Sequence, residues 1–95
     1  MNVWTLDYTR STQPRRSIAG AAPTSHSARS AALRAVAALN TAAGFEHPHY
    51  AVVVDGRIAV IISTGTDADG LPDHRGVAAL LHRIAREDNP LTPRT

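Results

Sequence analysis

The sequence predicts an α+β fold: a two-layer sandwich of a three-stranded mixed sheet with two helices on one face, in the order β-α-β-β-α. Two observations lead to this prediction. Two β-branched runs separated by Asp55-Gly56 indicate a β-hairpin, and two other stretches carry apolar residues at helical spacing. With 95 residues the chain can bury one modest core, so we expect a single domain over residues 1–90 and a tail over residues 91–95.

The hairpin is the strongest local signal in the chain. Residues 50–63 read YAVVVDGRIAVIIS, so valine and isoleucine dominate both halves. A two-residue type I′ turn needs positive φ at both central positions, and aspartate followed by glycine accepts that conformation. The two halves are therefore predicted to pair antiparallel at the centre of the fold.

The amino-terminal part of the chain is expected to hold one strand and one loop. In Val3–Tyr8 successive side chains point to opposite faces, so Trp4, Leu6 and Tyr8 share one face. Residues 10–23 contain serine, threonine, proline, glycine and the pair Arg15-Arg16, and they are predicted to form a flexible basic loop. A loop of this length is typical of functional or mobile segments.

Two helices follow from alanine content and periodicity. The first begins near Thr24–Ser27, where a hydroxyl can cap the free amides, and ends at Gly44. The second begins at Asp73 and ends at Asn89-Pro90, because the residue before proline avoids the helical region. Their apolar stripes are Leu33, Val36, Leu39 and Ala43 in the first helix and Val77, Leu80, Leu81 and Ile84 in the second.

The order of elements predicts how the strands pair. A strand, a crossover helix and a second, parallel strand form a right-handed unit, and the third strand returns antiparallel through Asp55-Gly56. This arrangement resembles a ferredoxin-like topology without its last strand. It is a likeness of topology alone.

The two faces of the hairpin differ in composition, and this difference suggests a function. In a regular register, one face carries His49, Ala51, Val53, Ile58, Val60 and Ile62, and the other carries Tyr50, Val52, Val54, Arg57, Ala59 and Ile61. The first face is more uniformly apolar and is predicted to lie under the helices. The second face is then left open, where tyrosine and arginine favour an interface. The predicted protein interface is Tyr50, Val52, Val54, Arg57, Ile61 and Trp4; the alternative is that the loop over residues 10–23 covers this face.

These features predict a small non-enzymatic protein that acts by protein–protein interaction through its sheet face. An accessory or regulatory role, in a phage or mobile element, suits its size, and a homodimer is the simplest way to cover the open face. The chain has no cysteine, no signal peptide is visible, and its apolar runs are too short to cross a bilayer. We therefore expect a soluble cytoplasmic protein with no membrane partner.

Nucleic-acid binding is the alternative function. Residues 1–45 hold five arginines and one acid, a net charge of +4, which can mark a surface for phosphates. The absence of aromatic residues from Ile58–Ile62 counts against base stacking on the sheet. The arginines that would contact nucleic acid are Arg10, Arg15, Arg16, Arg29 and Arg34.

No catalytic, cofactor or metal site is predicted. His47 and His49 flank a proline, and His74 and His82 are eight residues apart, so neither pair has the usual spacing of zinc ligands. Asp67, Asp69 and Gly70 fail the EF-hand pattern, because glycines would occupy its first and twelfth positions. The serine, histidine and aspartate residues show no nucleophile motif.

Overall fold

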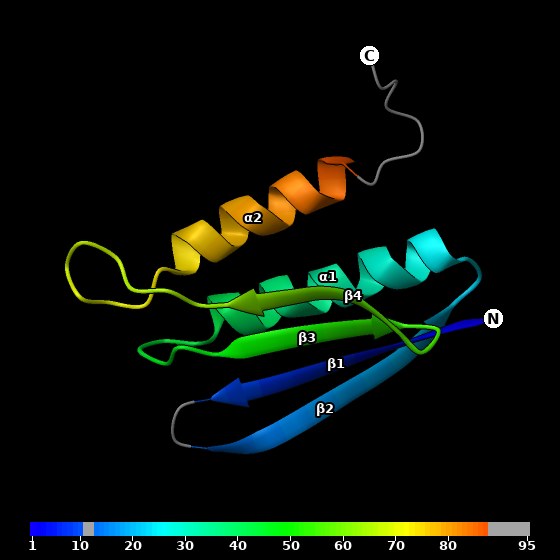
Figure 1. Ribbon diagram of the computed structural model, residues 1–95, viewed down its shortest axis with the longest axis horizontal. Coiled ribbons are helices and arrows are strands. Elements are labelled where there is room, and N and C mark those ends of the chain that lie inside the picture. The colour runs from blue at the N-terminus through cyan, green and yellow to red at the C-terminus, as the bar shows by residue number, and fades with distance from the viewer. Residues whose placement is uncertain (11–12, 88–95) are drawn as a thin grey trace.

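The chain begins with two strands where the sequence predicted one. The computed structural model describes residues 1–10 and 13–87, so the predicted tail over residues 91–95 lies outside the described part. The elements in chain order are β1 (Asn2–Arg10), β2 (Gln13–Ala22), α1 (Ser25–Thr41), β3 (His49–Val54), β4 (Arg57–Ser63) and α2 (His74–Glu87) (Figure 1).

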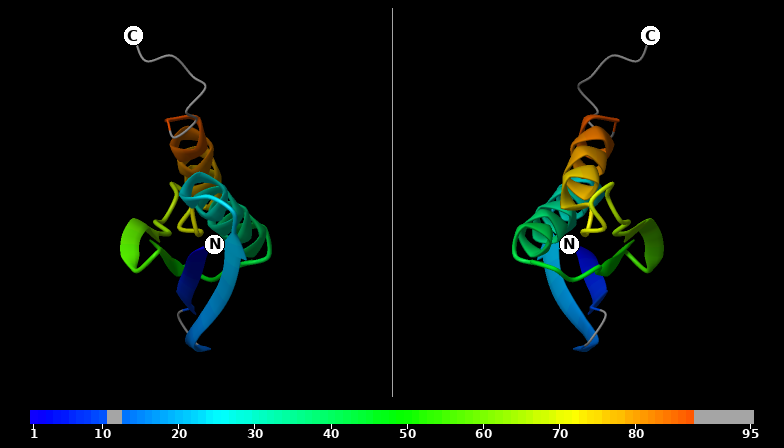
Figure 2. Two further views of the ribbon diagram at one scale, coloured as in Figure 1. Left: turned by 90° about the vertical axis from the view of Figure 1, so that its right-hand side faces the viewer. Right: turned by 90° about the vertical axis from the view of Figure 1, so that its left-hand side faces the viewer.

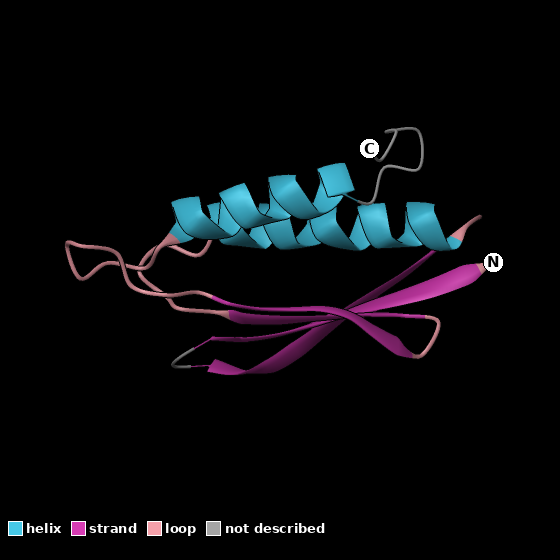
Figure 3. Ribbon diagram, turned by 45° about the horizontal axis from the view of Figure 1, so that its top comes forward, coloured by secondary structure: helices cyan, strands magenta, loops and turns pink. Residues whose placement is uncertain are grey.

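The four strands form one sheet in the order β2-β1-β3-β4, and every neighbouring pair is antiparallel. Both helices lie on the same side of this twisted sheet (Figure 3), so the predicted α+β class and the single helical layer are confirmed. The predicted three-stranded mixed sheet is wrong. Because β2 turns the chain back before α1 begins, β1 and β3 run antiparallel, and the predicted parallel crossover does not form.

The additional strand, β2, occupies the segment predicted as a flexible basic loop. Ile18 pairs with Leu6, and Gly20 pairs with Trp4. A β-carbon at Gly20 would lie 2.6 Å from Cε2 of Trp4, so the indole ring rests directly on the β2 backbone. Only glycine leaves room for this contact, which explains why a residue of low β propensity occupies this position of the strand.

The hairpin between β3 and β4 confirms the predicted turn but not the predicted register. Asp55 and Gly56 have φ of 51° and 79°, as a type I′ turn requires. Val53 pairs with Ile58 but Val52 pairs with Val60, so Ala59 is an extra residue in β4, a β-bulge. Beyond this bulge, every β4 side chain points to the face opposite the one that a regular register would give it.

The core lies between α1 and the middle of the sheet. Four residues of α1 are buried against the sheet: Ala28, Ala32, Leu33 and Val36. The small alanines let the helix approach closely, and large side chains from β1 and β3 fill the space opposite. Thr24 caps α1, since its hydroxyl accepts a 3.0 Å hydrogen bond from the Ser27 amide.

The second helix packs alongside α1 (Figure 2). Val77 and Leu81 are its buried residues. At its start, His74 Nδ1 lies 3.1 Å from Asn40 Oδ1, and His74 Nε2 lies 2.7 Å from the Gly44 carbonyl oxygen. This histidine therefore joins α2 to the end of α1, which accounts for one of the histidines considered as a metal ligand.

Candidate functional site

The described residues leave uncovered the side of the sheet away from the helices, which we call the open face (Figure 2). The views of Figure 2 place both helices on the opposite side, and no described segment covers this one. Strand alternation and the pairing register assign its residues. They are Val3, Thr5, Asp7 and Thr9 in β1, Arg15, Ser17, Ala19 and Ala21 in β2, His49, Ala51 and Val53 in β3, and Ile58, Ile61 and Ser63 in β4.

These residues form cross-strand rows of different polarity. The row near the β3–β4 turn contains Ala19, Thr5, Val53 and Ile58, one from each strand. The next row contains Ser17, Asp7, Ala51 and Ile61, and a third contains Thr9, His49 and Ser63. The open face is therefore apolar toward the β3–β4 turn and polar toward the opposite end.

Large and small side chains are segregated across the open face. The edge strand β4 contributes Ile58 and Ile61, which are 69% and 63% exposed. The other edge strand, β2, contributes Arg15 at its start and then the small residues Ser17, Ala19 and Ala21. One side of the open face is therefore raised by two isoleucines, and the other side is low over Ser17, Ala19 and Ala21.

Two hydrogen bonds fix the polar groups of the open face. The Ser17 hydroxyl donates to Asp7 Oδ1, which joins β2 to β1. His49 Nδ1 lies 2.8 Å from Ser63 Oγ, which joins β3 to β4. Asp7 is the acid and His49 the histidine among the open-face residues, and they stand on the two central strands.

The sequence prediction assigned the two sheet faces the wrong way round. Trp4, Tyr50 and Val52, predicted at the open interface, are 9%, 1% and 0% exposed and belong to the core beneath α1. Val54 is half-buried on the same side. The reason is volume: an alanine-rich helix needs large side chains opposite it, and this face supplies the tryptophan and both tyrosines.

The other two predicted interface residues lie apart from this group. The bulge at Ala59 places Ile61 on the open face, the position that the interface prediction requires. Arg57 is exposed at the start of β4 and lines a hollow on the helix side. The predicted covering loop is not observed, since its residues 13–22 extend the sheet at its edge.

Tyr50 brings a polar hydroxyl group into the core. Its hydroxyl has no hydrogen-bond partner among the described residues. Burial raises the pKa of this phenol, and the positive charge of Arg10 opposes the shift. Tyr50 is therefore a core residue whose neutral form is favoured, rather than an interface residue.

The five arginines proposed for nucleic acid do not gather on one surface. Arg10 stacks over the Tyr8 ring, with Cζ 5.7 Å from the ring centroid, and Arg16 pairs with Tyr8 at the same end of the sheet. Arg29 lines a hollow beside the β3–β4 turn, at the opposite end, and Arg34 lines a groove between the helices. Arg15 is exposed on the edge strand β2.

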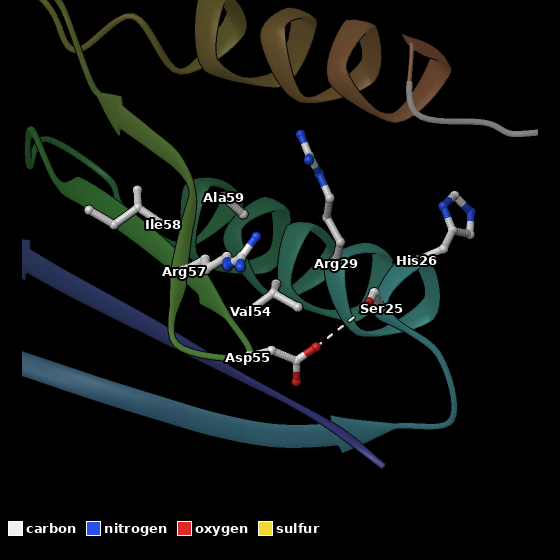
Figure 4. A pocket seen from close by; sticks show the side chains of 8 residues that line it. All are labelled: Ser25, His26, Arg29, Val54, Asp55, Arg57, Ile58 and Ala59. Carbon is white, nitrogen blue, oxygen red and sulfur yellow. Dashed lines mark hydrogen bonds between the residues drawn. The ribbon is translucent and has the colours of Figure 1, made fainter.

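A hollow with a volume of about 620 Å³ lies beside the β3–β4 turn (Figure 4). It is lined by Ser25, His26, Arg29, Val54, Asp55, Arg57, Ile58 and Ala59. Asp55 is engaged within the fold: Oδ1 accepts from the Val3 amide at 3.1 Å and Oδ2 accepts from Ser25 Oγ at 3.3 Å. The Asp55 amide donates to the Val3 carbonyl at 2.9 Å, so this residue ties the turn to β1 and α1.

Neither a metal-binding cluster nor a membrane-spanning helix is found among the described residues. Over residues 1–10 and 13–87, no group of three histidine, aspartate or glutamate residues is placed to hold a metal ion. Neither described helix combines the length and the apolar character that a membrane span would need.

Comparison with known proteins adds no relative. No protein-family model, no curated protein and no solved structure matches this chain.

Proposed function

We propose that this protein is a non-enzymatic accessory or regulatory protein that acts by protein–protein interaction through the open face, and that it forms a homodimer. One observation carries the proposal. Val3, Ile58 and Ile61 are 54%, 69% and 63% exposed on one side of a sheet, and the apolar residues Ala19, Ala51 and Val53 lie on the same side. A sheet face bathed in water normally carries polar residues, and a continuous exposed apolar patch is typical of an interaction site.

The edges of the sheet support contact through the face rather than through an added strand. The exposed edge of β2 begins Gln13-Pro14-Arg15-Arg16, in which proline lacks an amide hydrogen and arginine brings charge. The other edge strand, β4, is interrupted by the bulge at Ala59. Proline, charge and bulges are the usual means by which edge strands avoid pairing with another chain.

The same observations give no support to nucleic-acid binding. The open face carries no aromatic side chain, since Trp4, Tyr8 and Tyr50 all lie beneath the helices, and it carries the acid Asp7. Base stacking on the sheet would need exposed aromatics, and a carboxylate repels phosphate. The arginines are divided between opposite ends of the sheet and the helical layer.

The proposal is tested by the oligomeric state of a matched pair of variants. Ile58→Glu places a charge at the most exposed isoleucine of the open face, whereas Phe45→Glu removes an apolar side chain that is 83% exposed in the loop after α1. By light scattering after size exclusion, we expect dimers for the wild type and for Phe45→Glu. We expect a monomer for Ile58→Glu, with an unchanged circular dichroism spectrum. Dimers of Ile58→Glu, or a wild-type monomer at every concentration, would contradict the proposal.

A further inference from the structure

We infer that two copies pack open face to open face about a two-fold axis parallel to the strands, so that β4 of each copy covers β2 of the other. This inference rests on the proposed function and adds the arrangement of the partner. It follows from the shape, the charge and the size of the open face.

Shape selects the direction of the axis. The raised strand, β4, and the low strand, β2, stand at opposite edges of the sheet. An axis that runs between β1 and β3 reverses the strand order, so Ile58 of one copy lies over Ala19 of the partner, and Val53 lies over the partner's Thr5. An axis across the strands would instead stack β4 on β4, with isoleucine against isoleucine, and leave the alanines of β2 uncovered.

The two directions of the axis differ in how well the side chains of the two copies would fill the space between the sheets. Facing sheets lie about 10 Å apart, and their side chains fill the space between them when large residues meet small ones. Each pairing of isoleucine with alanine occurs twice in a two-fold dimer, because the same surface acts in both directions. The open face is therefore complementary to itself in one orientation only.

The same orientation brings His49, which can donate a hydrogen bond, near the carboxylate of Asp7. The axis parallel to the strands places β1 over β3 of the partner, so Asp7 lies over the partner's Ala51, the open-face neighbour of the partner's His49. His49 has its Nδ1 on Ser63, and Nε2 has no partner among the described residues. The ring can thus offer Nε2 to a carboxylate on the second copy.

The size of the open face is sufficient for a specific but weak dimer. Four strands about 4.8 Å apart and six residues of about 3.3 Å give a projected area near 400 Å² per copy. The real surface exceeds its projection, so a pair buries on the order of 1,000 Å², at the lower end for specific interfaces. A dissociation constant in the micromolar range is expected, which permits exchange between copies.

The arrangement is tested by joining chosen positions across the dimer. The sequence contains no cysteine, so introduced thiols are unique. We expect dibromobimane, a very short linker, to join Ala19→Cys to Ile58→Cys when the two variants are mixed. Each variant alone should give at least tenfold less product. In the proposed dimer the two copies of position 19 lie at opposite sides of the interface, and so do the two copies of position 58.

The outcomes separate this inference from the proposed function. Efficient linkage of Ile58→Cys to itself, in a dimer that Ile58→Glu abolishes, would overturn the arrangement and leave the proposed function standing. A dimer that Ile58→Glu does not affect would overturn both. As an independent check, His49→Asp should weaken the dimer about fivefold and Asp7→Asn should restore it in the double variant. An unchanged dissociation constant for His49→Asp would contradict the pairing of β1 with β3.

Discussion

The two faces of the sheet are built from the same strands but have different surroundings: one packs against α1, and no described segment covers the other. On β4, the adjacent residues Ile61 and Ile62 have identical side chains, yet they are 63% and 2% exposed. Ile62 belongs to the face that supplies large side chains to an alanine-rich helix. Ile61 belongs to the open face, which carries both apolar and polar side chains and is covered by no described element. Apolar character alone therefore does not identify the core. The alanine-rich helix covers the face that carries the larger side chains.

The largest expected effect comes from truncating those two isoleucines in turn. Ile62→Ala should lower the free energy of unfolding by about 2–4 kcal/mol, because it leaves a cavity in the core. Ile61→Ala should change it by less than about 0.5 kcal/mol when the chain is monomeric. Urea denaturation at low protein concentration measures both, and equal losses would break the distinction between the faces.

A second pair of neighbours sharpens the comparison on β2. Gly20→Ala should lower the free energy of unfolding by about 1–3 kcal/mol, since the new methyl group meets the Trp4 indole at 2.6 Å. Ala19→Val lies on the open face and should leave the monomer intact while it weakens the dimer, because valine fills the space meant for isoleucine. Thermal unfolding and sedimentation measure the two effects separately. A stable Gly20→Ala protein would contradict the contact between Trp4 and β2.

The smallest expected effect concerns the buried hydroxyl of Tyr50. This group has no hydrogen-bond partner among the described residues. Tyr50→Phe should therefore leave the free energy of unfolding unchanged or raise it by up to about 1 kcal/mol. Tyr8→Phe, which removes the hydroxyl group of another tyrosine of the core, serves as the control. A loss of more than about 1 kcal/mol in Tyr50→Phe would indicate that the hydroxyl is satisfied in the folded protein.

The pH dependence of the same residue has a definite sign. The pKa of Tyr50 is raised in the folded state, so folding favours its protonated form. This contribution to stability is complete below the pKa of an unfolded tyrosine, about 10, and is lost as pH rises toward the folded value. Alkaline unfolding should therefore be less steep in Tyr50→Phe than in the wild type.

The sequence was sufficient to predict the hairpin turn and both helices, since each depends on local chemistry. Asp55-Gly56 dictates a positive φ, and alanine-rich periodicity with a hydroxyl cap dictates α1. The fold class follows from these elements together. The prediction failed where a residue's conformation depends on a distant neighbour.

Two such dependences explain the errors. The strand β2 carries glycine at position 20 because Trp4 rests on its backbone there, a contact that no local pattern reveals. The bulge at Ala59 exchanges the faces of the residues that follow it, and an insertion of one residue leaves no trace in an uninterrupted apolar run. Of the predicted interface, only Ile61 lies on the open face, and it does so because of that bulge.

The central claim is that the open face is the surface of contact. Two-dimensional ¹H–¹⁵N NMR spectra recorded over a dilution series test it most directly. We predict that the amide shifts that change with concentration cluster at Ala19, Val53, Ile58 and Ile61, and that those of Phe45 and α2 stay constant. Shifts that change on α2, or that do not change anywhere, would contradict the claim.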